Sequence, residues 1–329
     1  MHAIRQHAFG GPETLLWEEV ADPVPGPGQA RIAVAAAGVH LLDTAIRSGT
    51  TGGPFPVPDL PMTPGREVAG TVDAVGSEDD QGWVGRRVVA HLGMASGGYA
   101  ERAVAAVDAL FALPDAVAPA DAVAMVGTGR TAMAILDVAS VGPADVVVVP
   151  AAAGGLGALL VQAAARRGAT VVGLAGGPAK REMATERGAH LSVDYTEMGW
   201  PERVRAWLGE HDLGATVGLD GVGGAIGREV LELLAPGGRL VLFGSSSGDA
   251  LPLSAGDLYR TGVTVTAAVG ARMQSRPGGI RAFAQDALDA LAAGELHPLV
   301  HPPFPLAEAA DAHRSLESRA TTGKVVLTP

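Results

Sequence analysis

The stretch that decides the fold is residues 146–157, VVVVPAAAGGLG, in which four valines lead through Pro150 into a turn with three glycines. The following residues, ALLVQAAARRG, are mostly apolar and contain no proline. This order predicts a buried strand, a tight turn and a helix. The local pattern has two interpretations: the turn binds the phosphates of a dinucleotide, or the strand and helix simply pack closely there.

Composition limits the kind of protein and its partners. The chain has 329 residues, of which 47% are hydrophobic and 18% charged, enough for two domains with a core in each. A net charge of −11 disfavours binding to nucleic acid or to an anionic membrane surface, so a small molecule is the expected partner. The absence of cysteine excludes disulfides, thiolate nucleophiles and zinc sites built on sulfur.

The expected location is the cytoplasm, without a membrane partner. The N-terminal residues, MHAIRQHAFGGPE, lack the continuous apolar stretch of a signal peptide. Residues 146–165 are about as long as a membrane span, but Pro150 and three glycines interrupt them. A strand followed by a helix is the better interpretation of this segment.

The pattern of apolar and turn-forming residues differs between the first third of the chain and the part after it. Short β-rich segments at 29–39, 67–76, 84–92 and 97–105 predict a barrel-like or sandwich-like unit. From about residue 120, apolar strands alternate with amphipathic helices, which is typical of a doubly wound parallel sheet. We expect strands at 146–149, 170–174, 191–193, 216–219 and 240–243, and helices at 156–167, 179–187, 200–208 and 226–234. After Gly262 the regular alternation of strands and helices ends and the pattern is mixed. We expect a helix at 306–318 and a last strand at 324–327.

The glycine turn has the context of a dinucleotide site. Ala152 stands at the first glycine of Gly-x-Gly-x-x-Gly, whereas Gly154 and Gly157 keep the spacing. The strand, the turn and the following helix N-terminus are what a pyrophosphate needs. After the second strand no acid precedes Glu182, and Lys180 and Arg181 could meet a 2′-phosphate, which favours NADP over NAD. Lys180 could also simply lie on a solvated helix face.

Several motifs together resemble the zinc-independent quinone oxidoreductase (zeta-crystallin-like) group of the medium-chain dehydrogenase/reductase superfamily. They are AAAGVHLLDTAIRSG (35–49), PGREVAGTVDAVG (64–76), GGYAERAVA (97–105), AAAGGLG (151–157), LDGVGG (219–224), LAPGGRLVLFGSSSG (234–248) and SLESRATTGKVVL (315–327). The resemblance implies an α/β protein: a GroES-like β-rich catalytic domain over 1–120, completed by 263–329, and a Rossmann NADP-binding domain over 121–262. It also implies a homodimer joined through the nucleotide domains.

The resemblance implies contacts to NADPH. The pyrophosphate would lie against the glycine turn, and the 2′-phosphate would lie near Lys180 and Tyr195, although Gly177 replaces a serine or threonine that relatives often have. Thr131 matches a threonine that approaches the nicotinamide. The expected cofactor-binding residues are Ala153, Gly154, Gly155, Leu156, Gly157, Gly176, Lys180, Tyr195, Phe243, Gly244, Ser245 and Lys324.

The loop GVHLLD carries the expected chemistry. Zinc-dependent relatives have their ligands at the positions of His40, Arg66 and Gly127, and one imidazole cannot hold catalytic zinc, so we expect no metal. His40 replaces the asparagine usual in quinone oxidoreductases. An imidazole titrates near neutrality, so His40 is the candidate proton donor or substrate hydrogen-bond donor, unless it only packs and bonds a backbone carbonyl. With His40, the expected catalytic residues are Thr131 and Asp43, the latter orienting the loop.

The expected activity is that of an NADPH-dependent reductase that delivers hydride, without zinc, to a quinone or an α,β-unsaturated carbonyl compound. A non-catalytic NADPH-binding sensor on the same fold is an alternative. GSSSG at 244–248 also satisfies the nucleophile elbow of a serine hydrolase, but DALPLSAG is a poor start for the helix that such an elbow requires. The loops at 54–64 and 267–276 are expected to line the acceptor pocket.

Overall fold

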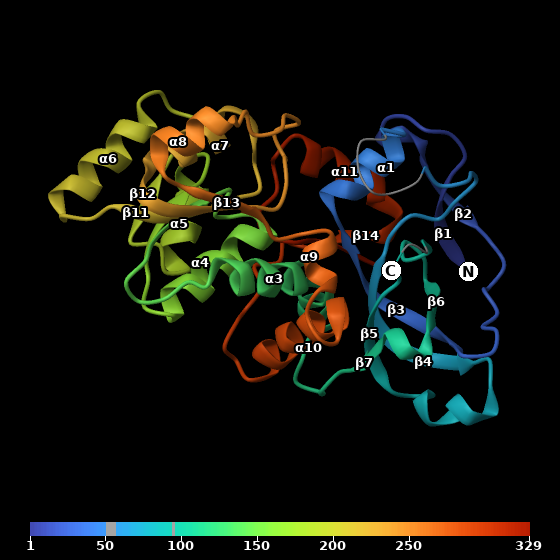
Figure 1. Cartoon of the computed structure of the whole chain (residues 1–329). Helices are drawn as coiled ribbons and strands as arrows, with labels where there is room; N and C mark the ends of the chain where they lie inside the picture. Colours follow the sequence, from blue (N-terminus) through green and yellow to red (C-terminus); the bar gives the residue numbers. More distant parts are fainter. Residues whose placement is uncertain (51–56, 94–95) are drawn as a thin grey trace. The chain divides into compact units, whose positions relative to one another are not determined.

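The computed structural model describes residues 1–50, 57–93 and 96–329, and the chain forms two compact units (Figure 1). The first unit comprises residues 1–128 and 287–329, and the second comprises residues 129–286. As expected, the N-terminal part and the C-terminal tail share one unit, with the middle of the chain in the other. The proline-rich loop expected at 54–64 falls partly outside the described residues, since 51–56 are not described.

The second unit is built on a six-stranded sheet with helices on both faces. The strand order is β10-β9-β8-β11-β12-β13, and all the pairings in it are parallel. Helices α3, α4 and α5 cover one face and α6, α7 and α8 cover the other (Figure 1). The strands are β8 (Val146–Pro150), β9 (Thr170–Leu174), β10 (Leu191–Val193), β11 (Ala215–Asp220), β12 (Leu234–Leu242) and β13 (Thr264–Ala267).

The helices of this unit pack through apolar faces, as the strand and helix alternation predicts. All five residues of β8 are buried, and seven of the twelve residues of α4 are buried, because this strand and helix form the centre of the fold. The helices are α3 (Arg130–Ala139), α4 (Gly155–Arg166), α5 (Pro178–Glu186), α6 (Trp200–Glu210), α7 (Gly224–Leu233), α8 (Ala255–Thr261), α9 (Ala271–Gln274) and α10 (Gly279–Ala292). The residues of α10 from Ala287 onward are counted with the first unit.

The boundaries of the second unit differ from the expected 121–262. The unit ends 24 residues later because β13 pairs with β12 as the sixth strand, and because Met273 and Phe283 pack against Ala134. It starts 8 residues later because α2 (Pro119–Val123) packs on strands of the first unit. Neither contact has a local sequence signal, so the alternation of strands and helices alone does not indicate where this compact unit begins and ends.

The first unit is β-rich, as expected. Its main sheet has the order β14-β15-β3-β4-β5-β7, with β6 also paired to β3. A separate hairpin joins β1 and β2. The strands are β1 (His2–Gln6), β2 (Leu15–Glu19), β3 (Gln29–Val39), β4 (Glu67–Val75), β5 (Arg87–His91), β6 (Arg102–Ala106), β7 (Leu110–Ala112), β14 (Phe304–Pro305) and β15 (Val325–Thr328). Two helices of this unit, α1 (Leu41–Ser48) and α11 (Ala309–Glu317), pack against each other.

One apolar helical stretch links the units. It runs through α2, a π-helical segment over Ala124–Gly129 and α3. Pro119–Ala139 is long and apolar enough to cross a membrane by length and composition alone, but most of it is buried within the fold. The core helix of a folded protein meets the same criterion. Residues 146–165, which are about as long as a membrane span, form the strand β8 and most of the helix α4, as predicted.

Candidate active site and cofactor turn

The glycine turn between β8 and α4 has the geometry of a phosphate-binding turn. Gly154 N–H donates to the carbonyl of Ala151 at 2.8 Å, and Ala151 has a positive φ of 51°. A Cβ on Gly157 would lie 2.2 Å from the Ala151 oxygen, so only glycine allows the helix to approach the turn this closely. Because α4 begins at Gly155, its first amide groups point away from the helix and can bind an anion.

The other expected cofactor residues of the second unit lie at the same edge of the sheet. Since the strands are parallel, the segments that follow their carboxyl ends meet at one edge. Gly176 and Lys180 follow β9, Tyr195 follows β10, and the segment 243–245 follows β12. The order of the strands reverses between β8 and β11, which is where such sheets bind ligands. The structure therefore brings these residues to the edge that the sequence predicted.

Hydrogen bonds join the start of α5 to the end of β10 and the residues after it. The Asp194 carboxylate accepts hydrogen bonds from the amide of Gly177 at 2.7 Å and from the amide and hydroxyl of Thr196. These bonds, led by the Thr196 hydroxyl, hold the pKa of Asp194 below its usual range. The Arg181 Nε atom donates to the Ser192 carbonyl at 3.0 Å, so part of its hydrogen-bonding capacity is used within the unit. Lys180 lies half-buried on the same helix, one residue before Arg181.

His40, Glu67 and Lys324 form a tight cluster in the first unit, which we call the His40 cluster. His40 Nε2 lies 2.6 Å from one oxygen of Glu67 and 3.1 Å from the Lys324 ammonium, and that ammonium donates to the other Glu67 oxygen at 2.7 Å. Glu67 is fully buried and Lys324 nearly so, whereas the His40 side chain is 24% exposed. The expected residues His40 and Lys324 therefore come together around an acid that sequence reasoning missed.

Glu67 is ionised in this environment. Burial by itself would raise the pKa of Glu67, but the charges of His40 and Lys324 outweigh it and hold that pKa well below its usual range. His91, paired with Glu67 across β4 and β5, adds a smaller effect in the same direction. In the sequence, Glu67 stands inside the motif PGREVAGTVDAVG (64–76), directly after Arg66, and nothing local marks it as a site residue.

A second buried network, the His313 cluster, joins α1 to α11. The Tyr99 hydroxyl lies 3.1 Å from both the Asp43 carboxylate and His313 Nε2. Arg47 lies 3.3 Å from His313 Nδ1 and forms an ion pair with Glu317 at 2.6 Å. Burial lowers the pKa of His313 to about 4, the nearby charges of Asp43 and Arg47 acting in opposite directions. This imidazole is neutral at physiological pH.

Asp43 connects the two clusters through the backbone. Its Oδ2 atom accepts the His40 amide at 2.8 Å and the Tyr99 hydroxyl, so it fixes the start of α1, on which His40 sits. The carboxyl is buried and also lies 3.7 Å from the Arg66 guanidinium. This geometry suits the orienting role expected for Asp43. Thr131, on α3, is half-buried and belongs to the second unit, apart from His40 in the division of the chain.

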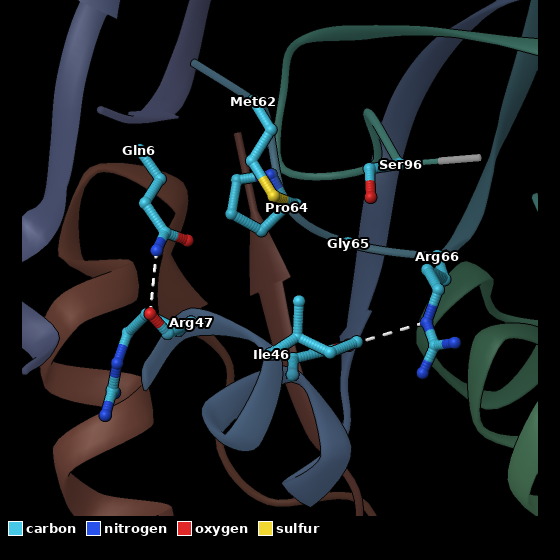
Figure 2. Close-up of a pocket in the computed structure, with 9 residues that line it drawn as sticks. Gln6, Ile46, Arg47, Met62, Pro64, Gly65, Arg66 and Ser96 are labelled. Carbon is cyan, nitrogen blue, oxygen red and sulfur yellow. Dashed lines mark hydrogen bonds and ion pairs between the residues drawn. The ribbon is translucent and has the colours of Figure 1, made fainter. Parts of the chain in front are cut away.

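A small pocket of the first unit adjoins Asp43. Figure 2 shows the Gln6 amide bonded to the Arg47 carbonyl, with Arg66 on the opposite wall. The Gln6 Oε1 atom is buried and has no hydrogen-bond partner among the residues that the structure describes. The lining residues are Gln6, Asp43, Ile46, Arg47, Met62, Pro64, Gly65, Arg66 and Ser96. Met62 and Pro64 come from the described part of the proline-rich loop.

The residues at the zinc positions of relatives do not suit zinc. His40 Nε2 faces a carboxylate and an ammonium group, Arg66 is a cation, and Gly127 has no ligand atom. Among the described residues, no group of three or more histidine or acidic side chains is arranged to hold a metal ion. Zinc chemistry therefore has no suitable set of donors at these positions.

The serine hydrolase alternative does not fit the structure. An elbow needs a helix directly after the serine. Here the GSSSG segment forms an exposed turn, and the next helix, α8, begins only at Ala255. Ser246 N–H and Ser247 N–H donate to the carbonyls of Gly221 and Val222, so this segment packs beside the end of β11.

Comparison with known proteins agrees with this architecture. Residues 26–115 match the alcohol dehydrogenase GroES-like domain, and residues 155–292 match a domain described as zinc-binding dehydrogenase. The chain is 33% identical to the quinone oxidoreductase of Pseudomonas aeruginosa over 98% of both chains. It is 35% identical to a 2-haloacrylate reductase of a Burkholderia species, over 98% of this chain and 97% of the relative.

Solved structures share the whole fold. A mycobacterial protein complexed with NADPH has a TM-score of 0.87 and 35% identity, and the quinone oxidoreductase of Escherichia coli complexed with NADPH has a TM-score of 0.87 and 29% identity. Both comparisons cover 100% of each chain. The chain belongs to the quinone oxidoreductases of the medium-chain dehydrogenase/reductase superfamily. Its GroES-like and Rossmann units are those that the resemblance implied.

Proposed function

We propose that this NADPH-dependent oxidoreductase transfers hydride to a conjugated, electron-poor acceptor, a quinone or an α,β-unsaturated carbonyl compound, without zinc. The observation that supports the proposal is the His40 cluster, in which a partly exposed imidazole lies against a buried carboxylate. Relatives named quinone oxidoreductase and 2-haloacrylate reductase support a conjugated acceptor. We also propose that it acts as a soluble enzyme in the cytoplasm.

Residues of the second unit would bind the cofactor in this proposal. Bound NADPH supplies the hydride. The turn at 154–157 would bind the pyrophosphate through its amide groups, with Ala153 and Leu156 beside them, and Lys180 with Tyr195 would hold the 2′-phosphate. Phe243, Gly244 and Ser245 would line the same edge of the sheet, and Thr131 would approach the nicotinamide.

His40 would complete the reduction as proton donor. Hydride addition to the β-carbon of an enone leaves enolate charge on the oxygen, and a donor placed there stabilises the transition state more than the ground state. The acceptor gains one hydride and one proton, and His40 regains its proton from water. Asp43 would orient the loop rather than react, since its carboxyl is buried and hydrogen-bonded.

Stopped-flow oxidation of NADPH with a panel of quinones and enones tests the proposal. We expect saturable turnover on at least one class without added metal, and unchanged turnover after dialysis against a chelator. Tight binding of NADPH without its oxidation by any acceptor would contradict the proposed enzymatic activity and would favour a non-catalytic NADPH-binding sensor. Loss of activity on chelation, restored by zinc, would contradict the zinc-free mechanism.

Cofactor preference has its own test. Lys180→Ala should raise the KM for NADPH by about tenfold and leave that for NADH unchanged, because only the 2′-phosphate uses the ammonium group. Arg205→Ala, which removes an exposed cation of α6 paired with Glu202, is the matched control. Equal effects on both cofactors would remove Lys180 from the phosphate site.

We also propose that the protein forms a homodimer through its second unit. It is supported by β13, which ends the six-stranded order, and by Tyr259 on the adjacent α8, which is 89% exposed. An edge strand offers unpaired backbone groups to another copy. Light scattering coupled to size-exclusion chromatography should give twice the mass of the 33.1 kDa chain, and a monomer would contradict the proposal.

A further inference from the structure

Glu67 is enclosed between two glycine backbones. A Cβ on Gly38 would lie 2.3 Å from one Glu67 oxygen, and a Cβ on Gly127 would lie 1.4 Å from the other. Neither glycine has a positive φ, so backbone conformation does not require glycine at either position. Both positions instead leave space for the Glu67 carboxylate. Gly127 lies on the π-helical segment, an irregularity that is frequent at functional sites.

Gly38 also lets Lys324 reach this carboxylate. Lys324 directly precedes β15, and β3 lies between β15 and β4 in the sheet. Gly38 pairs with Val326, and a side chain on Gly38 would come within 3.0 Å of the Lys324 side chain. The lysine therefore crosses β3 where that strand has no side chain. The strands it links are already joined by hydrogen bonds through β3, so the ion pair is not needed to hold them together.

A buried ion pair of this kind is expensive if its only task is stability. Desolvation of two charges offsets most of their attraction, and apolar side chains of similar size often stabilise a fold as well or better. Here the buried pair lies against a partly exposed imidazole. The Glu67 Oε1 atom lies 2.6 Å from His40 Nε2, so the carboxylate charge acts directly on the ring.

We propose that Glu67 is a positioning residue for His40: its buried charge holds the ring and favours the protonated form, and Lys324 limits that effect through the same carboxylate. This inference rests on the proposed role of His40 as proton donor. The charged groups around the ring are Glu67 on β4, Lys324 before β15 and Asp43 on α1, with His91 on β5 behind Glu67 and Arg66 beside Asp43.

The two charges predict shifts of opposite sign. A negative charge next to an imidazole favours its protonated form, and a positive charge disfavours it. Glu67→Gln should therefore move the titration of His40, and the limb of the pH profile of kcat/KM that depends on it, to lower pH by about one unit. Lys324→Met should move both to higher pH. A purely structural role for the pair gives no reason for opposite shifts.

The experiment measures the full chain in two ways. The pH profile of kcat/KM is recorded with NADPH and 1,4-benzoquinone, and the His40 ring signal is titrated by NMR without cofactor, assigned with His40→Asn. Glu317→Gln is the matched control, since it also removes one carboxylate of an ion pair in the first unit but does not touch His40. It should leave both midpoints unchanged.

The outcomes separate the inference from the proposed function. Opposite shifts for Glu67→Gln and Lys324→Met support the inference, and no shift, or equal shifts in one direction, overturn it. If Glu67→Gln does not fold, the double variant Glu67→Gln/Lys324→Met removes both buried charges, and its midpoint must then lie below that of Lys324→Met alone. If the natural protein oxidises no NADPH, the proposed function fails, while the NMR titration still decides the role of Glu67.

Discussion

Two imidazoles of the first unit, those of His40 and His313, lie near buried carboxyl groups but differ in their access to solvent. His40 contacts the Glu67 carboxylate, and its side chain is 24% exposed. His313 reaches Asp43 through the Tyr99 hydroxyl and is fully buried. A proton donor must exchange protons with water and face the acceptor, whereas a neutral buried ring can only pack and hydrogen-bond. A histidine near an acid is therefore a candidate for proton transfer only where part of its ring is exposed to solvent.

The largest expected effect in this comparison is on catalysis at His40. His40→Ala should lower kcat/KM by about 100-fold, the usual contribution of one general acid. It should change the melting temperature little, because it removes a single, partly exposed side chain at the residue before α1. Steady-state kinetics and thermal unfolding check both parts. Unchanged kcat/KM would make His40 a packing residue like His313.

The next effect is on stability at His313. His313→Ala should lower the free energy of unfolding by about 3 kcal/mol at pH 7, because it leaves a cavity and removes the partner of Tyr99. The kcat/KM of the folded variant should stay within about twofold of the natural value, since His313 has no proposed part in proton transfer. Denaturant unfolding and kinetics measure the two. His211→Ala, at an exposed position of the second unit, is the control.

The pH dependence of stability should follow His313. Its pKa is about 4 in the folded protein and near 6.5 when unfolded, so only the unfolded chain binds this proton between those values. The stabilising contribution is complete above about pH 6.5 and is lost as the pH falls towards 4. The stability advantage over His313→Ala should therefore shrink by about 3 kcal/mol between pH 7 and pH 4. An advantage independent of pH would mean that the ring is not buried neutral.

The smallest effect is expected at Glu317. Its side chain is 36% exposed, so solvent weakens its ion pair with Arg47. Glu317→Gln should cost less than about 1 kcal/mol and leave the pH profile of turnover unchanged. A shifted profile would show that the two histidine clusters are electrostatically coupled, and the contrast between them would fail.

The sequence predicted the strands and helices of the second unit closely, because alternation of buried strands and amphipathic helices is a local signal. The strand expected at 170–174 and the strand expected at 191–193 have these limits in the structure. The helix expected at 156–167 is Gly155–Arg166. The strand expected at 240–243 begins earlier, at Leu234, because pairing with β11 extends it through the turn PGG.

The site was predicted in part. His40 and Lys324 were expected from separate motifs, and the structure joins them although they are 284 residues apart. Glu67 was missed because its importance comes from burial and from the empty space at Gly38 and Gly127, which appear only once the chain is folded. Asp194 was missed for a similar reason, since its contact with Gly177 links the ends of two neighbouring strands.

The most direct test of the account is the pH profile of kcat/KM for the natural protein, His40→Asn and His313→Asn, measured side by side with NADPH and one quinone. The limb near neutral pH is expected to disappear in His40→Asn and to stay in place in His313→Asn. A limb that persists in His40→Asn would show that the proton comes from another group and would contradict the central claim.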